Sequence, residues 1–558
     1  MPGSSSPRPL LSVVVPVKDT AAWAEEFLES VLAQDVSGLE VVLVDNGSRD
    51  GTSSILEAWA AAHPVLRVVR SGAGSAGAAR NDGIDAATGT YLAFADSDDI
   101  VPEGAYRMML ESLESSGSDM VIGDHLKFSA TRTWSPTRRW YAFDGDVSGA
   151  RPVEVAPLLG GRACWNRLFR RSFWDDTALR FPDVASVEDI EPMTRAFVEA
   201  RSIDVVSACV YLYRDRGDTS SLSVRSDEQS TLRYLEQELR CARLLVDRDE
   251  RLRQQHAEVV YDADGWAHLQ RFLAAKPDAA AIRTVARATS ALVRTIPTPA
   301  HAAAPVRQML WSLALADHWA AAAAFADGVS SGSAVDELGA WIDAVVALRE
   351  DDETTASALA SGGLLPVLVN TADSVPDEWL EARLPRLRDL TPVPSQSELV
   401  SAMASAVSSG EAALVSTVAA LRHLVPVVVS HAESSADGLL IGGRLPGSGP
   451  STVMVIQLSG ATTVRVPLQR NSDGHQWSAR VAAGDLGIGR HEVHVLVPGV
   501  SGRFPVVTAR MPLPPVDAAF ALQPLADRKN GWRFLVDRRP TRRPGVRGLL
   551  GRAIGRGR

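Results

Sequence analysis

The sequence predicts an α/β domain at the N-terminus, followed by a helical region and a C-terminal β-sandwich. Three observations indicate this order. Apolar runs of strand length alternate with helical periodicity, then Ala- and Leu-rich amphipathic stretches follow, and finally short apolar runs separated by Gly, Asn and Asp appear. The predicted regions are 1–9 (a disordered N-terminus), 10–225, 226–428, 429–515 (an Ig-like sandwich) and 516–558 (a basic tail).

The first region is predicted from continuous β-branched runs, which are typical of buried parallel strands. Each of the first two runs is followed by apolar residues at helical spacing. The expected strands are 11–17, 39–44, 66–69 and 90–95, and the expected helices are 21–33 and 52–62. Strand and helix therefore alternate at βαβ spacing, which predicts a doubly wound sheet of the nucleotide-binding kind.

An acidic turn, Asp96-Ser97-Asp98-Asp99, directly follows the fourth predicted strand. Open α/β sheets bind ligands at the carboxyl ends of their strands. Carboxylate oxygens there suit a divalent cation that grips a diphosphate. Taken alone, the turn equally fits a helix cap or a solvated loop.

Four segments come at successive predicted strand ends and helix starts: Val14–Asp19, Val44–Gly51, Gly77–Ile84 and Phe94–Asp99. Together they resemble the ordered signatures of family-2 inverting glycosyltransferases, which have the GT-A fold. The resemblance covers about residues 10 to 220. It implies a nucleotide-diphosphate sugar as donor and Mn²⁺ or Mg²⁺ as cofactor.

The resemblance also implies site residues. The residues it places around the nucleotide sugar are Pro16, Asp19, Asp45, Arg80, Asn81 and Asp96, and those it places at the metal are Asp98 and Asp96. Asp45 either accepts hydrogen bonds from the nucleoside or caps the next helix. Arg80 either pairs with phosphate oxygens or lies on the surface at a helix start. Asp19 and Asn46 stand where many relatives carry Asn and Asp, which puts the nucleobase preference in doubt.

Two later segments resemble the acceptor side of the same enzymes. Cys164–Phe173 matches their Trp-Asn-Lys-Leu-Tyr-Arg-Arg stretch, and Ser186–Ile190 matches their Glu-Asp motif, in which the Asp is the general base. An inverting transfer needs one carboxylate to take the proton of the attacking hydroxyl. We expect Asp189 to be that base and Glu188 to orient it or the acceptor. The alternative is that both residues cap the helix that follows.

Tyr211–Arg216 and the hydroxyl residues after it resemble the strand and loop that close the donor site. The resemblance implies that Arg214 or Arg216 reaches the diphosphate, with help from Ser220 or Ser221. A basic loop after a strand is otherwise a solvated loop.

Composition limits the function classes. A net charge of −10 argues against nucleic-acid binding, and three widely spaced cysteines indicate a reducing compartment without a disulfide framework. The glycines of 72–77 do not follow the first strand, so a dinucleotide site is not expected. We see no signal peptide and no long uninterrupted apolar run, so we expect no transmembrane helix.

Residues 538–558 contain eight arginines and no acid, with apolar residues interleaved. This composition predicts attachment to anionic lipid, and so a cytoplasmic enzyme peripheral on the inner face of the plasma membrane. A disordered basic tail is the alternative. The β-sandwich would bind glycan, hold a homo-oligomer together or only stabilise the chain.

The function expected from these features is a metal-dependent inverting glycosyltransferase. It would move a hexose or N-acetylhexosamine from a UDP-sugar to a hydroxyl of a cell-surface polysaccharide or teichoic-acid-like polymer. The alternative is a non-catalytic glycan-binding or assembly protein that keeps a transferase-like scaffold. A sugar-phosphate transferase is disfavoured because no paired His motif occurs among the eleven histidines.

Overall fold

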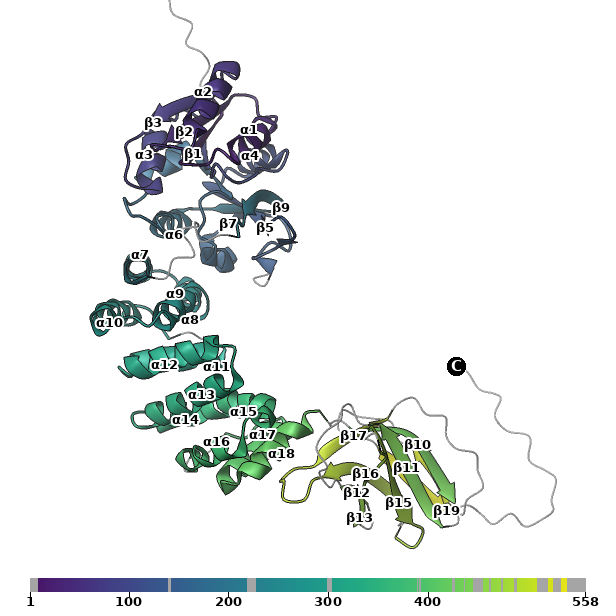
Figure 1. Cartoon of the computed structure of the whole chain (residues 1–558). Coiled ribbons are helices and arrows are strands. Elements are labelled where there is room, and N and C mark those ends of the chain that lie inside the picture. The colour runs from purple at the N-terminus through teal and green to yellow at the C-terminus, as the bar shows by residue number, and fades with distance from the viewer. Residues whose placement is uncertain are drawn as a thin grey trace, which may run out of the picture. The chain divides into compact units, whose positions relative to one another are not determined.

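The computed structural model describes residues 9–138, 142–217, 227–298, 304–388, 390, 393–423, 427–435, 437–444, 455–460, 463–472, 475–485, 489–508, 520–524 and 533–538. The chain divides into two compact units, Met1–Ser330 and Ser331–Arg558. Figure 1 shows the α/β sheet and helices of the first unit and the helices and β-strands of the second. The predicted order of an α/β domain, helices and a β-rich domain is confirmed.

The first unit is built on a nine-stranded sheet with the order β3-β2-β1-β4-β8-β5-β9-β7, and β6 pairs with β5. The first four strands are parallel, as the βαβ spacing predicts, and β8 runs antiparallel between β4 and β5. The strands are β1 (Leu11–Val17), β2 (Leu39–Asp45), β3 (Leu66–Arg70), β4 (Tyr91–Phe94), β5 (Met120–Phe128), β6 (Thr133–Trp134), β7 (Val147–Ala150), β8 (Arg167–Arg170) and β9 (Ile203–Arg214).

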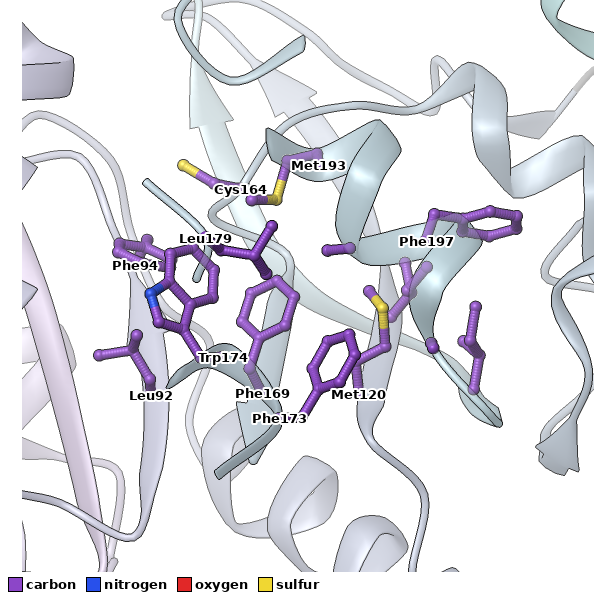
Figure 2. Packing of buried hydrophobic residues seen from close by; sticks show 14 of the residues in the cluster. Leu92, Phe94, Met120, Cys164, Phe169, Phe173, Trp174, Leu179, Met193 and Phe197 are labelled. Carbon is purple, nitrogen blue, oxygen red and sulfur yellow. The ribbon is translucent and has the colours of Figure 1, made fainter. Parts of the chain in front are cut away.

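Helices cover both faces of this sheet because successive strand residues point to opposite sides. Val14 of β1 packs in one buried cluster, and its neighbours Val13 and Val15 pack in the other. Figure 2 shows the first cluster, in which the Trp174 ring lies 5.1 Å from Phe94 and 5.0 Å from Phe169 between ring centroids. The covering helices are α1 (Ala24–Leu32), α2 (Thr52–Ala62), α3 (Ala76–Ala86), α4 (Ala105–Ser116), α5 (Arg171–Asp176) and α6 (Ile190–Glu199), with a 3-10 segment at Pro152–Gly160.

Six further helices belong to the first unit, and the second unit begins with more helices. The compact first unit thus extends beyond residue 225, where we expected the catalytic domain to end. The helices are α7 (Glu228–Leu245), α8 (Glu250–Asp262), α9 (Asp264–Ala274), α10 (Ala279–Val293), α11 (Pro305–Leu315), α12 (Trp319–Ser330), α13 (Ala334–Arg349), α14 (Glu353–Leu359), α15 (Leu365–Thr371), α16 (Asp377–Glu381), α17 (Glu398–Ser409) and α18 (Ala412–Leu421).

The run Glu353–Ser374, which contains α14 and α15, is long and apolar enough to cross a membrane by length and composition. Polar residues such as Ser361 and Asn370 interrupt the run, so it is not an uninterrupted apolar stretch of the kind on which the expectation of no transmembrane helix was based. Of its apolar window, 56 % is buried inside the fold, as is usual for a core helix.

The β-rich domain starts at residue 427, close to the predicted boundary, and continues beyond it. β18 and β19 pair with each other, and β19 pairs with β16, so the sheet reaches Arg538 where we expected a tail from residue 516. Its strands are β10 (Val427–Ser435), β11 (Gly438–Arg444), β12 (Val455–Ser459), β13 (Thr463–Pro467), β14 (Gln469–Arg470), β15 (Gln476–Ala482), β16 (Gly489–Leu496), β17 (Phe504–Thr508), β18 (Phe520–Pro524) and β19 (Arg533–Arg538). The apolar core of β19 is short and is flanked by arginines, so the sequence pattern does not predict a strand there.

Candidate functional site

The acidic turn lies at the point where the strand order reverses. β1 pairs with β2 on one side and with β4 on the other, and the turn follows the carboxyl end of β4. The hydroxyls of Thr20, in the loop after β1, and Ser97, in the acidic turn, are 3.0 Å apart and link the two loops. Ligands of doubly wound sheets bind at such a reversal.

Burial and neighbouring carboxylates raise the pKa of two residues of this turn, Asp98 and Asp99. Burial and then the charge of Asp96 raise the pKa of Asp98, and Arg216 acts against both. Burial, Asp98 and Asp96 raise the pKa of Asp99 well above its usual range. Such crowding favours a bound cation, because a cation stabilises the ionised carboxylates.

Within the described ranges, no three His, Cys, Asp or Glu side chains converge into a ready-made metal site. The carboxylates of the acidic turn nevertheless fit the usual Mg²⁺ arrangement, in which one or two carboxylates share the ion with substrate phosphates and water. Asp98 and Asp96 are the residues that would hold such an ion.

Arg214, the last residue of β9, and Arg216, two positions further on, both contact the acidic turn. Arg216 donates to Asp98 Oδ2 from Nε at 2.7 Å, and its guanidinium lies 4.3 Å from the centroid of the Trp23 ring. The backbone N–H of Arg214 donates to Asp99 Oδ1 at 2.7 Å, and its Nε donates to the carbonyl of Asp98 at 2.7 Å. Ser220 and Ser221 lie outside the described residues.

Arg80 of α3 joins the acidic turn to the Glu-Asp pair. Its side chain is 6 % exposed. Nη2 donates to Asp96 Oδ1 at 2.7 Å, and Nη1 donates to Glu188 Oε1 at 2.6 Å. One buried guanidinium therefore connects the two groups of carboxylates that the sequence predicted separately.

Asp189 occupies the N-cap position of α6, but its side chain makes no capping hydrogen bond. Its carboxylate is thus not used to cap the helix, which was the structural alternative for this residue. Burial and then the neighbouring Glu188 raise the pKa of Asp189 to about 7, and Arg80 acts against them. A carboxylate with a pKa near the working pH suits a general base.

The loop before this pair is held in an unusual backbone conformation. Val187 has a φ of +59°, a region that a β-branched residue rarely adopts. Strain of this kind persists only where the surroundings hold the backbone in place, and it is concentrated at functional sites.

The predicted nucleoside residues lie at the ends of β1 and β2. Pro16 pairs with Val44 in the sheet, and Asp19 Oδ1 accepts a hydrogen bond from the N–H of Arg49 at 2.7 Å. Asp45 is buried and accepts from Ser53, from the N–H of Ser48 at 3.0 Å and from Arg70 at 2.8 Å. Burial alone would raise the pKa of Asp45, but these hydrogen bonds and the charge of Arg70 lower it. Asp45 therefore organises its own loop in this structure.

Asn81 is engaged with the chain rather than turned toward the acidic turn. Its side-chain amide donates to the carbonyl of Phe181 at 2.8 Å and accepts from the N–H of Phe181 at 3.0 Å. Asn81 thus ties α3 to the segment that leads to the Glu-Asp pair.

Two site residues were missed in the sequence. Trp23 lies against Arg216, and the Tyr211 hydroxyl accepts from the N–H of Asp96 at 2.9 Å. Tyr211 and Asp96 are 115 positions apart, so local spacing carries no sign of their contact. Trp23 was counted as a core position of the first helix. The sequence position of Trp23 could have indicated a role, because a large aromatic residue at a loop–helix junction beside a ligand-binding sheet edge is a candidate for contact with the ligand.

Comparisons with known proteins identify relatives of the N-terminal domain. Residues 12–177 match the model of Glycosyl transferase family 2. The uncharacterized glycosyltransferase EpsJ of Bacillus subtilis is 30 % identical over 215 residues, which is 37 % of this chain and 61 % of EpsJ. The poly(ribitol-phosphate) beta-glucosyltransferase of Bacillus spizizenii is 26 % identical over 219 residues, 38 % of this chain and 33 % of that protein. The matched part of this chain thus spans less than two thirds of either relative.

Among solved structures, residues 1–349 of S. aureus TarS in complex with UDP-GlcNAc are 20 % identical, with a TM-score of 0.49 over 58 % of this chain and 92 % of that chain. The family assignment is drawn from the sequence match, and the fold is drawn from the strand order described above. Residues 12–177 of this chain therefore form a family-2 glycosyltransferase domain.

Proposed function

We propose that this protein is a metal-dependent inverting glycosyltransferase that takes its sugar from a UDP-sugar. The observation that carries the proposal is the Arg80 bridge between Asp96 and Glu188. Through this bridge, the acidic turn, whose carboxylates suit a metal ion and a diphosphate, lies close to the Glu-Asp pair, which contains the carboxylate suited to act as a base.

In the proposed reaction, Asp189 takes the proton of the acceptor hydroxyl while that oxygen attacks the anomeric carbon of the donor. The new glycosidic C–O bond forms as the bond to the diphosphate breaks, and the nucleoside diphosphate leaves with the bonding electrons. Attack from the side opposite the diphosphate inverts the anomeric centre. Arg216 and Arg214 stand beside the acidic turn, where they can stabilise the departing negative charge.

Asp98 and Asp96 would hold Mn²⁺ or Mg²⁺, which when bound supplies positive charge to the diphosphate leaving group. Arg216 occupies Asp98 Oδ2 in this structure. Arg216 would stabilise the phosphates of the donor from this position beside Asp98.

The proposed acceptor is a hydroxyl of a cell-surface polysaccharide or of a teichoic-acid-like polymer. The similarity to a poly(ribitol-phosphate) beta-glucosyltransferase supports the second class. The arginines of 538–558 support a place on the inner face of the plasma membrane, where binding to anionic vesicles tests it. The β-rich domain would then bind glycan or a second copy of the chain.

The decisive experiment compares Asp189→Asn and Asp98→Ala with Asp85→Asn, an exposed carboxylate on α3 that serves as the control. We expect Asp189→Asn to lower kcat for transfer from a UDP-sugar by about 10²- to 10⁴-fold without loss of UDP affinity. Asp98→Ala should weaken UDP binding in the presence of Mn²⁺, measured by calorimetry. If both variants turn over like Asp85→Asn, the domain is the transferase-like scaffold of the alternative reading.

A further inference from the structure

Helix α7 lies beyond the segment that matches the family, yet it makes polar contacts with two loops of the candidate site. One is the base loop, residues 184–189, which carries Glu188 and Asp189. The other is the segment 161–166, which precedes β8 and which we call the 161–166 loop. The inference below rests on the proposed function of Asp189.

The contacts with the base loop come from one side of α7. Arg233 Nε donates to the hydroxyl of Ser186 at 3.2 Å, directly before the strained Val187. The thiol of Cys241 donates to the carbonyl of Ile190 at 3.7 Å, directly after Asp189. These two contacts lie on either side of the Glu-Asp pair. They support from outside the loop in which Val187 adopts its left-handed backbone conformation.

The contacts with the 161–166 loop pass through a buried ion network. Arg162 is 6 % exposed and donates to Glu238 Oε1 of α7 at 2.5 Å and to Asp264 Oδ2 at 2.9 Å. Glu238 is fully buried, and its other oxygen lies 2.8 Å from Nε2 of His256 in α8. Burial alone would raise the pKa of Glu238, but Arg162 and His256 lower it to about 2, so the carboxylate is ionised.

The 161–166 loop in turn touches both halves of the candidate site. The Trp165 ring stacks on the Tyr211 ring at 4.4 Å between centroids, and the Tyr211 hydroxyl holds the N–H of Asp96. On the other side, the buried Cys164 belongs to the same apolar cluster as Met193 of α6, the helix that follows Asp189. Buried Arg167 donates to the carbonyls of Gly161 and Ala163 and closes the loop on itself.

We propose that α7 is part of the catalytic unit and that Glu238 and Arg233 are positioning residues. Glu238 fixes the 161–166 loop through Arg162, and Arg233 fixes the base loop through Ser186. Neither residue would touch the donor. Their loss should therefore lower turnover and leave nucleotide binding intact.

The experiment uses the full chain with Glu238→Gln and Arg233→Ala, and Arg248→Ala as the matched control. Arg248 also lies next to α7 and pairs with Glu199 of α6 at 2.5 Å, but that pair is exposed and lies at the opposite end of α6 from the Glu-Asp motif. Arg233 is only partly buried, so Arg233→Ala remains informative if Glu238→Gln does not fold. UDP with Mn²⁺ is the binding probe.

We expect Glu238→Gln and Arg233→Ala to lower kcat at least about tenfold, since small displacements of reacting groups have large effects on rate. The stoichiometry and Kd of UDP binding should stay within about twofold of wild type, as in any pure positioning defect. Amide hydrogen exchange should become faster in the 161–166 loop of Glu238→Gln and in residues 184–189 of Arg233→Ala. Arg248→Ala should match wild type in every measurement.

Two outcomes overturn the inference. One is turnover and exchange in both variants equal to those of Arg248→Ala. The other is a parallel loss of UDP binding sites and kcat, which indicates unfolding rather than positioning. An inactive wild type whose variants still show the localised exchange would contradict the proposed function and would support the positioning of these loops by α7.

Discussion

Arg80 is almost fully buried and divides its two terminal nitrogens between Asp96 and Glu188. A buried cation of this kind is retained only with close anionic partners, because an unpaired charge in the interior is strongly unfavourable. The same guanidinium opposes the rise in the pKa of Asp189. The pKa of Asp189 is therefore raised by burial and by the neighbouring Glu188, and Arg80 opposes both.

The pH dependence of turnover follows from the pKa of about 7 for Asp189. The base acts in its ionised form, so kcat should rise with pH through this value and fall on the acid side. About half of the enzyme is competent at pH 7 and about a tenth at pH 6, which predicts a roughly fivefold lower kcat at pH 6. The apparent value belongs to the Glu188–Asp189 pair.

This profile is measured as kcat with saturating donor between pH 5.5 and 8.5, with UDP affinity followed over the same range. A flat kcat between pH 5.5 and 7 would contradict the assignment of Asp189. A fall in kcat that only follows a loss of UDP affinity would also count against it.

The residues of the candidate site were predictable where they belong to a local sequence motif. Asp96, Asp98, Arg80 and the Glu188–Asp189 pair each stand in a local motif, and the structure brings all of them together. The engagement of Asp45 with Ser53 and of Asn81 with Phe181 was not predictable. Such contacts depend on which loops meet in space, and residue type and local spacing contain no record of that.

At the scale of elements, α3 approaches the base loop closely because Gly77 has no side chain. A Cβ atom at this position would lie 2.5 Å from the carbonyl oxygen of Pro182 and 3.1 Å from Cβ of Glu188. Glycine here serves close packing, since Gly77 is not among the positions with positive φ. Two elements that carry site residues can therefore touch.

Gly77→Ala should lower both stability and turnover. Replacing Gly with Ala gains up to about 1 kcal/mol of helix propensity, and less in the first turn, whereas overpacking costs about 1–3 kcal/mol. We expect a net loss of about 1 kcal/mol in the free energy of unfolding, measured with urea, and a lower kcat because Glu188 is displaced from Arg80.

Gly72→Ala is the control for this substitution. An added Cβ there meets nothing within 4 Å, so stability and kcat should stay at their wild-type values. Equal behaviour of the two variants would show that α3 and the base loop can separate without consequence.

Most elements of the α/β sheet were predictable because the spacing of their apolar residues and the intrinsic preference of their residue types indicate the same secondary structure. The helix at Thr52–Ala62 and the strand at Leu11–Val17 have the bounds that the sequence predicts. The antiparallel strand β8 was not expected as a sheet member, because Arg167 and Arg170 give it a polar pattern. In the folded chain Arg167 donates to the carbonyls of Gly161 and Ala163, and Arg170 donates to the distant carbonyl of Ser118.

At the scale of the whole molecule, the chain combines an acidic overall charge with an arginine-rich C-terminal end. Residues 539–558 follow the last described strand, so their removal leaves every described element in place. Each arginine near an anionic surface contributes about 1 kcal/mol to binding. We expect the chain without residues 539–558 to lose co-sedimentation with phosphatidylserine vesicles and to keep its UDP affinity.

Neutral phosphatidylcholine vesicles are the control, and neither form of the protein should sediment with them. The binding of the full chain should also weaken as salt is raised, because the attraction is screened. Unchanged sedimentation of the shortened chain with anionic vesicles would contradict attachment through the arginines.

The Arg162–Glu238 pair has a consequence for how the protein is made. Its two partners are 76 positions apart, so during synthesis Arg162 leaves the ribosome well before Glu238 does. At about 5–20 residues per second the interval is about 4 to 15 s. Until α7 has left the ribosome, Arg162 in the 161–166 loop lacks the counter-charge that Glu238 provides in the folded protein. The N-terminal sheet can form early in translation, but the contacts of the 161–166 loop are completed only after the chain has extended well past residues 12–177, the segment that matches the family model.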